Sequence, residues 1–210
     1  MTEQRLRVDP PGPARPTGPT GPGGPYEPAD DHGVGSWLEE RLLNERIVLL
    51  QGAVSTVAAN RAAAALLTLD ALGTDPVRLH MTSGEGDLTA VFALVDALDV
   101  MRAPVHAVAV GEVGEAALGV YAAARRRLAY PHARFRLAEP KVAGVAGTAE
   151  QVASAAGRYL QALEDLVIRV AQATGRPRSR VEDDFAATRI LDATEAKEYG
   201  LVDEVIAPRR

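Results

Sequence analysis

The sequence contains no cysteine, and this absence excludes several chemistries at once. Disulfide bonds, thiol nucleophiles and cysteine-ligated metal sites all need a residue that the chain does not have. The four histidines and the absent cysteines give no support for a metal cluster either. We therefore expect a protein without a metal ion or other cofactor.

Aromatic residues, basic charge and long apolar runs are also scarce. Aromatic residues make up 4% of a chain that is 47% hydrophobic, so the apolar mass is mainly alanine, valine and leucine. The formal net charge of −5 gives no support for binding nucleic acid through a basic surface. No apolar run approaches the roughly 20 residues that cross a bilayer, and the first ten residues lack the apolar block of a secretory signal. We expect a soluble cytoplasmic protein that binds neither nucleic acid nor membranes.

Residues 1–35 differ in composition from the rest of the chain. Eight of the 14 prolines lie between Pro10 and Pro28, with glycine and threonine between them. A segment with so little to bury cannot offset its ordering entropy, so we predict a disordered Pro/Gly-rich tail. A recognition arm is the alternative. Residues 36–210 are predicted to form one folded domain.

Short apolar strands alternate with helical patterns through this domain. The alternation indicates an α/β fold with a largely parallel sheet that helices cover. The predicted strands are 46–54, 77–83, 103–110 and 133–139, with a final strand near residue 205. The predicted helices are 36–45, 56–72, 88–101, about 149–173, one after the glycine-rich turn 110–116, and a capped helix that begins near residue 192.

Several stretches of the chain, from about Trp37 to Ile206, resemble the Clp protease proteolytic subunit family. The stretch ERLLNERIVLLQGAV, followed by Ala59 and Asn60, matches the opening of that family. MTSGEGDLTAVFALVDAL matches its glycine turn, and RRRLAYPHARFRLAEP matches the run through its catalytic-histidine strand. The most specific match is the C-terminal DATEAKEYGLVDEVI, which follows ATGRP.

The resemblance implies a ClpP/crotonase-like α/β fold, a spiral of ββα units with a protruding strand-helix handle. The segment 141–166 aligns with that handle, through which two rings join. The resemblance also implies a serine peptidase whose subunits form heptameric rings that stack as a tetradecamer. An AAA+ ATPase unfoldase usually feeds the enclosed chamber.

All three catalytic positions of that family are substituted in this chain. The family motifs place Glu115 at the serine position, Ala138 at the histidine position and Thr188 at the aspartate position. Peptide hydrolysis by that route needs a nucleophile, a base and a group that orients the base. We predict that none of the three is functional. Gly86 and Ala116 take the positions of the two oxyanion-hole N–H groups.

The sequence offers more than one role for Glu115 and for the arginine run 125–127. An acid at the start of a helix interacts favourably with the helix dipole, and we favour this role for Glu115. Alternatively, Glu115 blocks the chamber site or pairs with a basic group on a neighbouring subunit. The arginine run is predicted to be a solvated loop, with an intersubunit salt bridge as the alternative.

We therefore predict a non-catalytic ring subunit, a pseudoprotease, that assembles with an active paralogue or with its own copies in ATP-dependent protein degradation. One alternative is an active serine-type endopeptidase that uses other groups. Ser83 and His80 suit this poorly because they point to opposite faces of a strand, and His132 is about 20 Å along the chain from position 138. His106 is most simply a core or edge histidine. The second alternative is crotonase-like acyl-thioester chemistry, with Glu85 and Glu115 as general bases.

Overall fold

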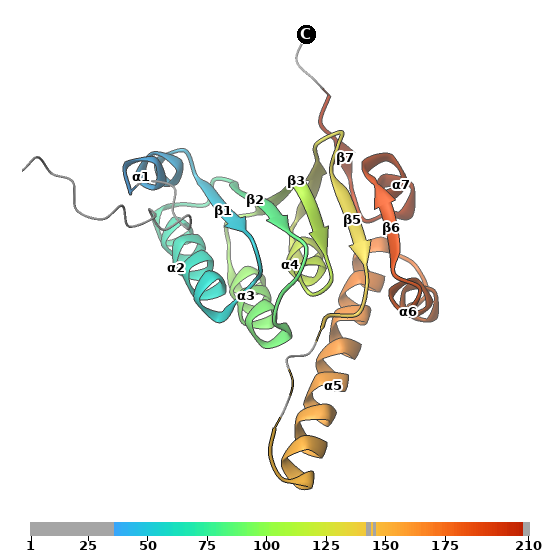
Figure 1. Cartoon of the computed structure of the whole chain (residues 1–210). Coiled ribbons are helices and arrows are strands. Elements are labelled where there is room, and N and C mark those ends of the chain that lie inside the picture. The colour runs from blue at the N-terminus through green and yellow to red at the C-terminus, as the bar shows by residue number, and fades with distance from the viewer. Residues whose placement is uncertain (1–35, 142–143, 145, 208–210) are drawn as a thin grey trace, which may run out of the picture. The chain divides into compact units, whose positions relative to one another are not determined.

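The computed structural model describes residues 36–141, 144 and 146–207, except for the side chain of Ser36 (Figure 1). The predicted N-terminal tail lies outside these residues. Part of the predicted handle strand, at 142, 143 and 145, also lies outside them. In the described part of the chain, no helix has the length and apolar character needed to cross a membrane.

A seven-stranded sheet forms the centre of the described structure (Figure 1). Five strands run in the order β1-β2-β3-β4-β7, and all of their pairings are parallel. The strand β5 pairs in parallel with the end of β3, and β6 pairs antiparallel with β5. The bounds are β1 Ile47–Gln51, β2 Val77–Ser83, β3 Val105–Gly114, β4 Arg126–Ala129, β5 Arg134–Leu137, β6 Arg189–Asp192 and β7 Glu204–Val205.

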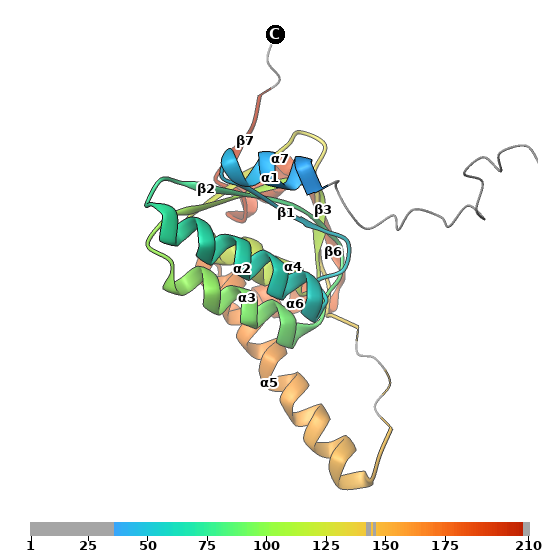
Figure 2. The same ribbon diagram turned by 90° about the vertical axis from the view of Figure 1, so that its left-hand side faces the viewer.

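Helices cover one side of the strands β1, β2 and β3 and extend beyond the sheet. In Figure 2 the helices α2, α3 and α4 lie together on one side of these strands, and α5 projects away from the body. The buried side chains of α5 are all in its second half, at Leu166, Val167 and Val170, so its first half protrudes as predicted for the handle helix. The bounds are α1 Ser36–Asn44, α2 Thr56–Leu72, α3 Leu88–Val100, α4 Ala117–Ala123, α5 Ala149–Thr174, α6 Arg178–Ala186 and α7 Ala193–Tyr199.

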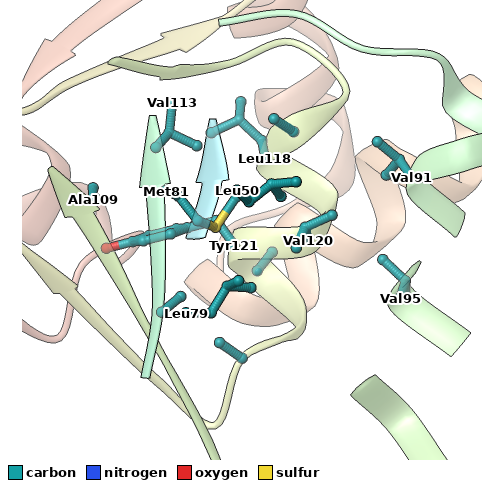
Figure 3. Packing of buried hydrophobic residues seen from close by; sticks show 14 of the residues in the cluster. Leu50, Leu79, Met81, Val91, Val95, Ala109, Val113, Leu118, Val120 and Tyr121 are labelled. Carbon is teal, nitrogen blue, oxygen red and sulfur yellow. The ribbon is translucent and has the colours of Figure 1, made fainter. Parts of the chain in front are cut away.

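The core lies between the sheet and these helices. In β2, Val77, Leu79, Met81 and Ser83 are buried, while the side chains between them are exposed or half-buried. Figure 3 shows the inward side chains of the strands facing α4, whose Leu118, Val120 and Tyr121 are fully buried. Small and branched apolar side chains fill this core, as the low aromatic content predicts.

The arginine run 125–127 does not form the predicted loop. Arg126 and Arg127 begin β4, which lies between β3 and β7 in the sheet. Arg126 pairs with Glu204, and Arg127 pairs with Asp203 at 2.6 Å. The loop prediction is wrong because the charges of these arginines are neutralised by two carboxylates of the same chain, Asp203 just before β7 and Glu204 at its start.

The charged stretch before the C-terminal motif also contains elements that the sequence did not reveal. It forms α6 and β6. In α6 the i,i+4 pairs Arg178–Glu182 and Arg180–Asp184 stabilise a helix whose apolar face consists of little more than Val181 and Phe185. The predicted capped helix that follows is confirmed as α7, with Asp192 and Glu195 forming a capping box.

Candidate functional site

A sharp turn joins β3 to α4 at Glu115, the residue that we predict to take the position of the family's nucleophile. The strand ends at Gly114 and the helix begins at Ala117, so only Glu115 and Ala116 connect them. Glu115 has a φ of +50°, in the left-handed region that residues other than glycine rarely adopt. In hydrolases, a strained turn between a strand and a helix presents a nucleophilic side chain. Here the same geometry presents a carboxylate.

Glu115 is bound to β5 by both its side chain and its backbone. Its Oε1 atom lies 2.5 Å from Nη1 of Arg136, and its N–H donates to the Arg136 carbonyl at 3.0 Å. The Glu115 side chain is only 2% exposed. The capping position of α4 is Ala116, and no side chain makes a capping hydrogen bond there. The partner of Glu115 within the chain is thus the basic group of Arg136, and Glu115 is not part of the first turn of α4 as we favoured.

Arg136 connects three segments around the turn. Its Nε atom donates to Glu112 at 2.8 Å, its Nη1 atom to Glu115 and its Nη2 atom to the carbonyl of Gly84 at 2.6 Å. The hydrogen bonds to Glu112 and to Glu115 raise the pKa of Arg136 above its usual value, against the opposing effect of burial. The guanidinium is therefore a permanent cation at the centre of this cluster.

Two glycines allow the chain to approach this cluster closely. A Cβ atom on Gly84 would lie 2.8 Å from a Glu112 carboxylate oxygen. A Cβ atom on Gly114 would lie 3.1 Å from both Cβ of Arg136 and the Gly84 carbonyl oxygen. Side chains at these positions would displace the ion pairs, so the backbone here is shaped around the arginine.

The residues predicted to take the family's histidine and aspartate positions, Ala138 and Thr188, lie at the same end of the β5–β6 pair. The antiparallel register joins Leu137 to Arg189, and Ala138 and Thr188 are the next residues beyond this pair. Ala138 is 5% exposed and its methyl group can neither accept nor donate a proton. Thr188 has a φ of +52°, and its N–H donates to the Phe185 carbonyl at 3.1 Å. Ala138 is thus next to Thr188 in the extended register, and it lies two residues after Arg136, the partner of Glu115.

The two residues predicted to supply the oxyanion-hole N–H groups, Gly86 and Ala116, lie in the turns that lead into α3 and α4. Gly86 forms an isolated parallel bridge with Val54, where a Cβ atom would lie 2.8 Å from the Val54 Cβ. Ala116 is fully buried directly after Glu115. Neither N–H is hydrogen-bonded to another described residue. Both N–H groups therefore remain available as donors, as the predicted oxyanion-hole role requires.

No other pair of side chains in the described ranges assembles a nucleophile and a base. Ser83 is buried and its Oγ donates to the Glu85 carbonyl at 3.0 Å, on the face of β2 opposite His80. Burial, with the nearby Arg78 and Arg126 as second causes, lowers the pKa values of His80 and His106. Within residues 36–141, 144 and 146–207, no histidine is hydrogen-bonded to a hydroxyl group, and no cluster of metal-ligating side chains occurs.

Sequence analysis missed Arg136, which organises the site. A short strand with arginine at alternate positions is typical of a solvent-facing edge, so nothing in RFRLAE marks the second arginine. The available signal is its spacing, because positions 136 and 138 share one face of a strand. Position 138 is the predicted histidine position. A basic residue at position 136 is therefore directed to the same side of the strand, where an acid at position 115 would need a partner.

The chain also matches known proteins over most of its length. The model of the Clp protease family matches residues 34–209. The ATP-dependent Clp protease proteolytic subunit 1 of Rhodococcus jostii is 31% identical over 173 residues, which cover 81% of this chain and 79% of the relative. The proteins of the same name from Thermobifida fusca and Streptomyces coelicolor are 30% and 33% identical, and they cover 81% and 86% of this chain and 78% and 83% of their own lengths. The chain therefore belongs to the Clp protease family.

Proposed function

We propose that this member of the Clp protease family is a non-catalytic ring subunit, a pseudoprotease. The observation that carries the proposal is the buried Glu115 carboxylate, paired with Arg136 at the turn where the family places its nucleophile. A carboxylate attacks amides poorly, and its negative charge opposes the oxyanion that peptide hydrolysis forms nearby. Ala138 supplies no base. The family's route to hydrolysis is therefore closed in this chain.

Assembly is the function that we transfer from the relatives, because the parts that would serve it are retained. The relatives are named proteolytic subunits of an ATP-dependent protease. The first half of α5 projects from the body and exposes Val152 at 41% and Leu160 at 62%. Exposed apolar side chains on a projecting helix favour packing against another subunit. We propose rings with an active paralogue, heptameric and stacked in pairs, that an AAA+ ATPase serves.

Two measurements test the two halves of this proposal. Treatment of the purified full-length chain with a serine-directed fluorophosphonate should give no labelling, and a fluorogenic peptide should not be cleaved. Labelling of any serine would refute inactivity. Co-expression with an intact paralogue from the same cells, followed by native mass spectrometry, should give mixed rings. A stable monomer that never enters such a complex would refute the assembly role.

The two alternative activities have less support than the inert ring subunit. For serine peptidase activity, Ser83 already donates to a carbonyl and has no imidazole beside it in the described structure. For acyl-thioester chemistry, Glu115 is engaged by Arg136, and the exposed Glu85 side chain has no hydrogen-bond partner in the described structure that would orient it as a base. A base in either reaction must be available to a substrate proton.

A further inference from the structure

We propose that the turn between β3 and α4 contains a carboxylate-binding site, which the chain fills with its own Glu115 side chain. The inference goes beyond the ring-subunit role and does not depend on it, because every contact lies within one chain. The binding group is Arg136, which holds the Glu115 carboxylate through Nη1. The site should therefore bind a small carboxylate through the guanidinium group of Arg136.

The orientation of Arg136 is fixed by contacts other than the one to Glu115. Nε is held by Glu112 and Nη2 by the Gly84 carbonyl, so the planar guanidinium has little freedom to turn. The Nη1 edge then points to the space that the Glu115 side chain fills. A guanidinium preorganised in this way retains its binding geometry when the Glu115 carboxylate is removed.

The site is also enclosed, which strengthens its preference for an anion. Glu115 is 2% exposed and the Arg136 side chain 24% exposed, so water competes weakly for the pair. Glu112 supplies a second carboxylate, but its side chain is 48% exposed. One anion is thus buried against Arg136 and the other lies at the surface. The buried position alone should behave as a binding site.

The geometry gives this proposal a direct test by chemical rescue. The substitution Glu115→Ala removes a methylene and a carboxylate, which together have the size and charge of an acetate ion. The cavity that remains lies beside an oriented cation, so added acetate should bind there and restore part of the lost stability. A ligand that binds only the folded state raises the melting temperature with its concentration.

The experiment measures the melting temperature of the full-length protein in acetate and in chloride, at equal ionic strength and one pH. Glu115→Ala should melt about 6–15 °C below the parent in chloride, because it leaves Arg136 without its buried partner. Acetate at about ten times its Kd should raise the melting temperature of this variant by about 3–6 °C more than that of the parent. Neutral acetamide should not.

Two matched variants separate site binding from a general effect of acetate. Glu112→Ala removes the exposed carboxylate of the same cluster, and acetate should not rescue it. Adding Arg136→Met to Glu115→Ala removes the cation, and acetate should then have no more effect than on the parent. If Glu115→Ala does not fold in chloride, the refolding yield in acetate against chloride replaces the melting temperature.

Equal responses of the parent and Glu115→Ala to acetate would overturn the proposal, as would equal rescue of Glu112→Ala. So would equal refolding yields in the two salts. These failures would leave the ring-subunit proposal intact, since that proposal rests on the absent nucleophile and base and on assembly. In turn, fluorophosphonate labelling or a lone monomer would leave the carboxylate site untouched.

Discussion

The described structure buries two carboxylates in different ways, Glu115 at the β3–α4 turn and Asp184 in α6. Glu115 has a positive φ and one cationic partner, Arg136. Asp184 lies in a regular helix and is 4% exposed. It accepts a hydrogen bond from the Tyr199 hydroxyl at 2.9 Å and pairs with Arg180 and Arg189, each at 3.2 Å.

The difference shows where the fold stores strain. A non-glycine residue in the left-handed region costs on the order of 1–3 kcal/mol and persists only when its surroundings hold it there. At Glu115, the ion pair with Arg136 and the backbone hydrogen bond to β5 keep the residue in this conformation. Asp184 requires no such support, because Arg189 and Tyr199 anchor it to β6 and α7, and Arg180 pairs with it within α6, without distorting the chain. Glu115 lies at the turn that we propose as the counterpart of the family's nucleophile turn, whereas Asp184 stabilises the C-terminal part of the fold.

The largest expected effect comes from removing Arg136, the partner of the strained Glu115. Arg136→Met should lower the free energy of unfolding by about 3 kcal/mol, because it leaves the Glu115 carboxylate buried without a cation. Arg134→Met is the matched control, since Arg134 is an exposed arginine of the same strand. It should change the stability by less than about 0.5 kcal/mol. Urea denaturation of both variants measures the difference, and equal stabilities would show that the pair with Glu115 is not stabilising.

The two acids also show which features of the structure could be predicted from the sequence. The bounds of α2 and β2 agree with prediction because a long alanine- and leucine-rich run and a strict alternation are strong local signals. The family motif led us to predict that Glu115 takes the position of the nucleophile. Its partner could not be predicted, because Arg136 reaches it through the β3–β5 register, which pairs Gly114 with Arg136. Strand register depends on tertiary contacts that a single sequence does not specify.

The missed elements have a related cause. The strands β4 and β6 are four residues long and begin with arginine, so neither length nor apolar alternation marks them. Their charges are compensated by residues distant in sequence, such as Asp203 for Arg127 and Asp184 for Arg189. From the sequence alone, a charged stretch is therefore predicted to be solvated, because those partners are not known. The C-terminal cap was found because Asp192 and Glu195 are only three residues apart.

The next largest effect should come from Asp184, the buried acid whose backbone is not strained. Tyr199→Phe removes the hydroxyl that donates to Asp184 and should cost about 1.5–3 kcal/mol, the range for a hydrogen bond to a charged group. Tyr130→Phe, at an exposed tyrosine, should be neutral within about 0.5 kcal/mol. Chemical denaturation checks both. A neutral Tyr199→Phe would mean that Arg180 and Arg189 alone satisfy Asp184.

A smaller effect concerns the relative stability of glycine and alanine variants at positions 115 and 184, which should be opposite at the two positions. At position 115 the glycine variant should be about 1 kcal/mol more stable than the alanine variant, because glycine adopts a φ of +50° without strain. At position 184 the alanine variant should be about 1 kcal/mol more stable than the glycine variant, because glycine weakens a helix. Each comparison removes the carboxylate in both variants, so only the backbone term differs. The same order at both positions would show that Glu115 is not held in a strained conformation.

The smallest effect concerns the partly exposed pair of Asp203 with Arg127 and appears only in acid. Burial of Asp203 opposes its ionisation, but hydrogen bonds from the Arg127 side chain and backbone, with its charge, lower the pKa of Asp203 below the usual value. A carboxylate whose pKa is lower in the folded state stabilises the protein above the unfolded pKa, near 3.9, and loses that contribution as the pH falls through the folded pKa. The unfolding free energy of the parent should therefore fall more steeply below about pH 4 than that of Asp203→Asn. If the unfolding free energies of the two proteins fall in parallel in acid, the charge pair is not stabilising. Arg127 would then stabilise β4 through its contacts with uncharged groups, among them the 2.6 Å hydrogen bond to the Ala173 carbonyl.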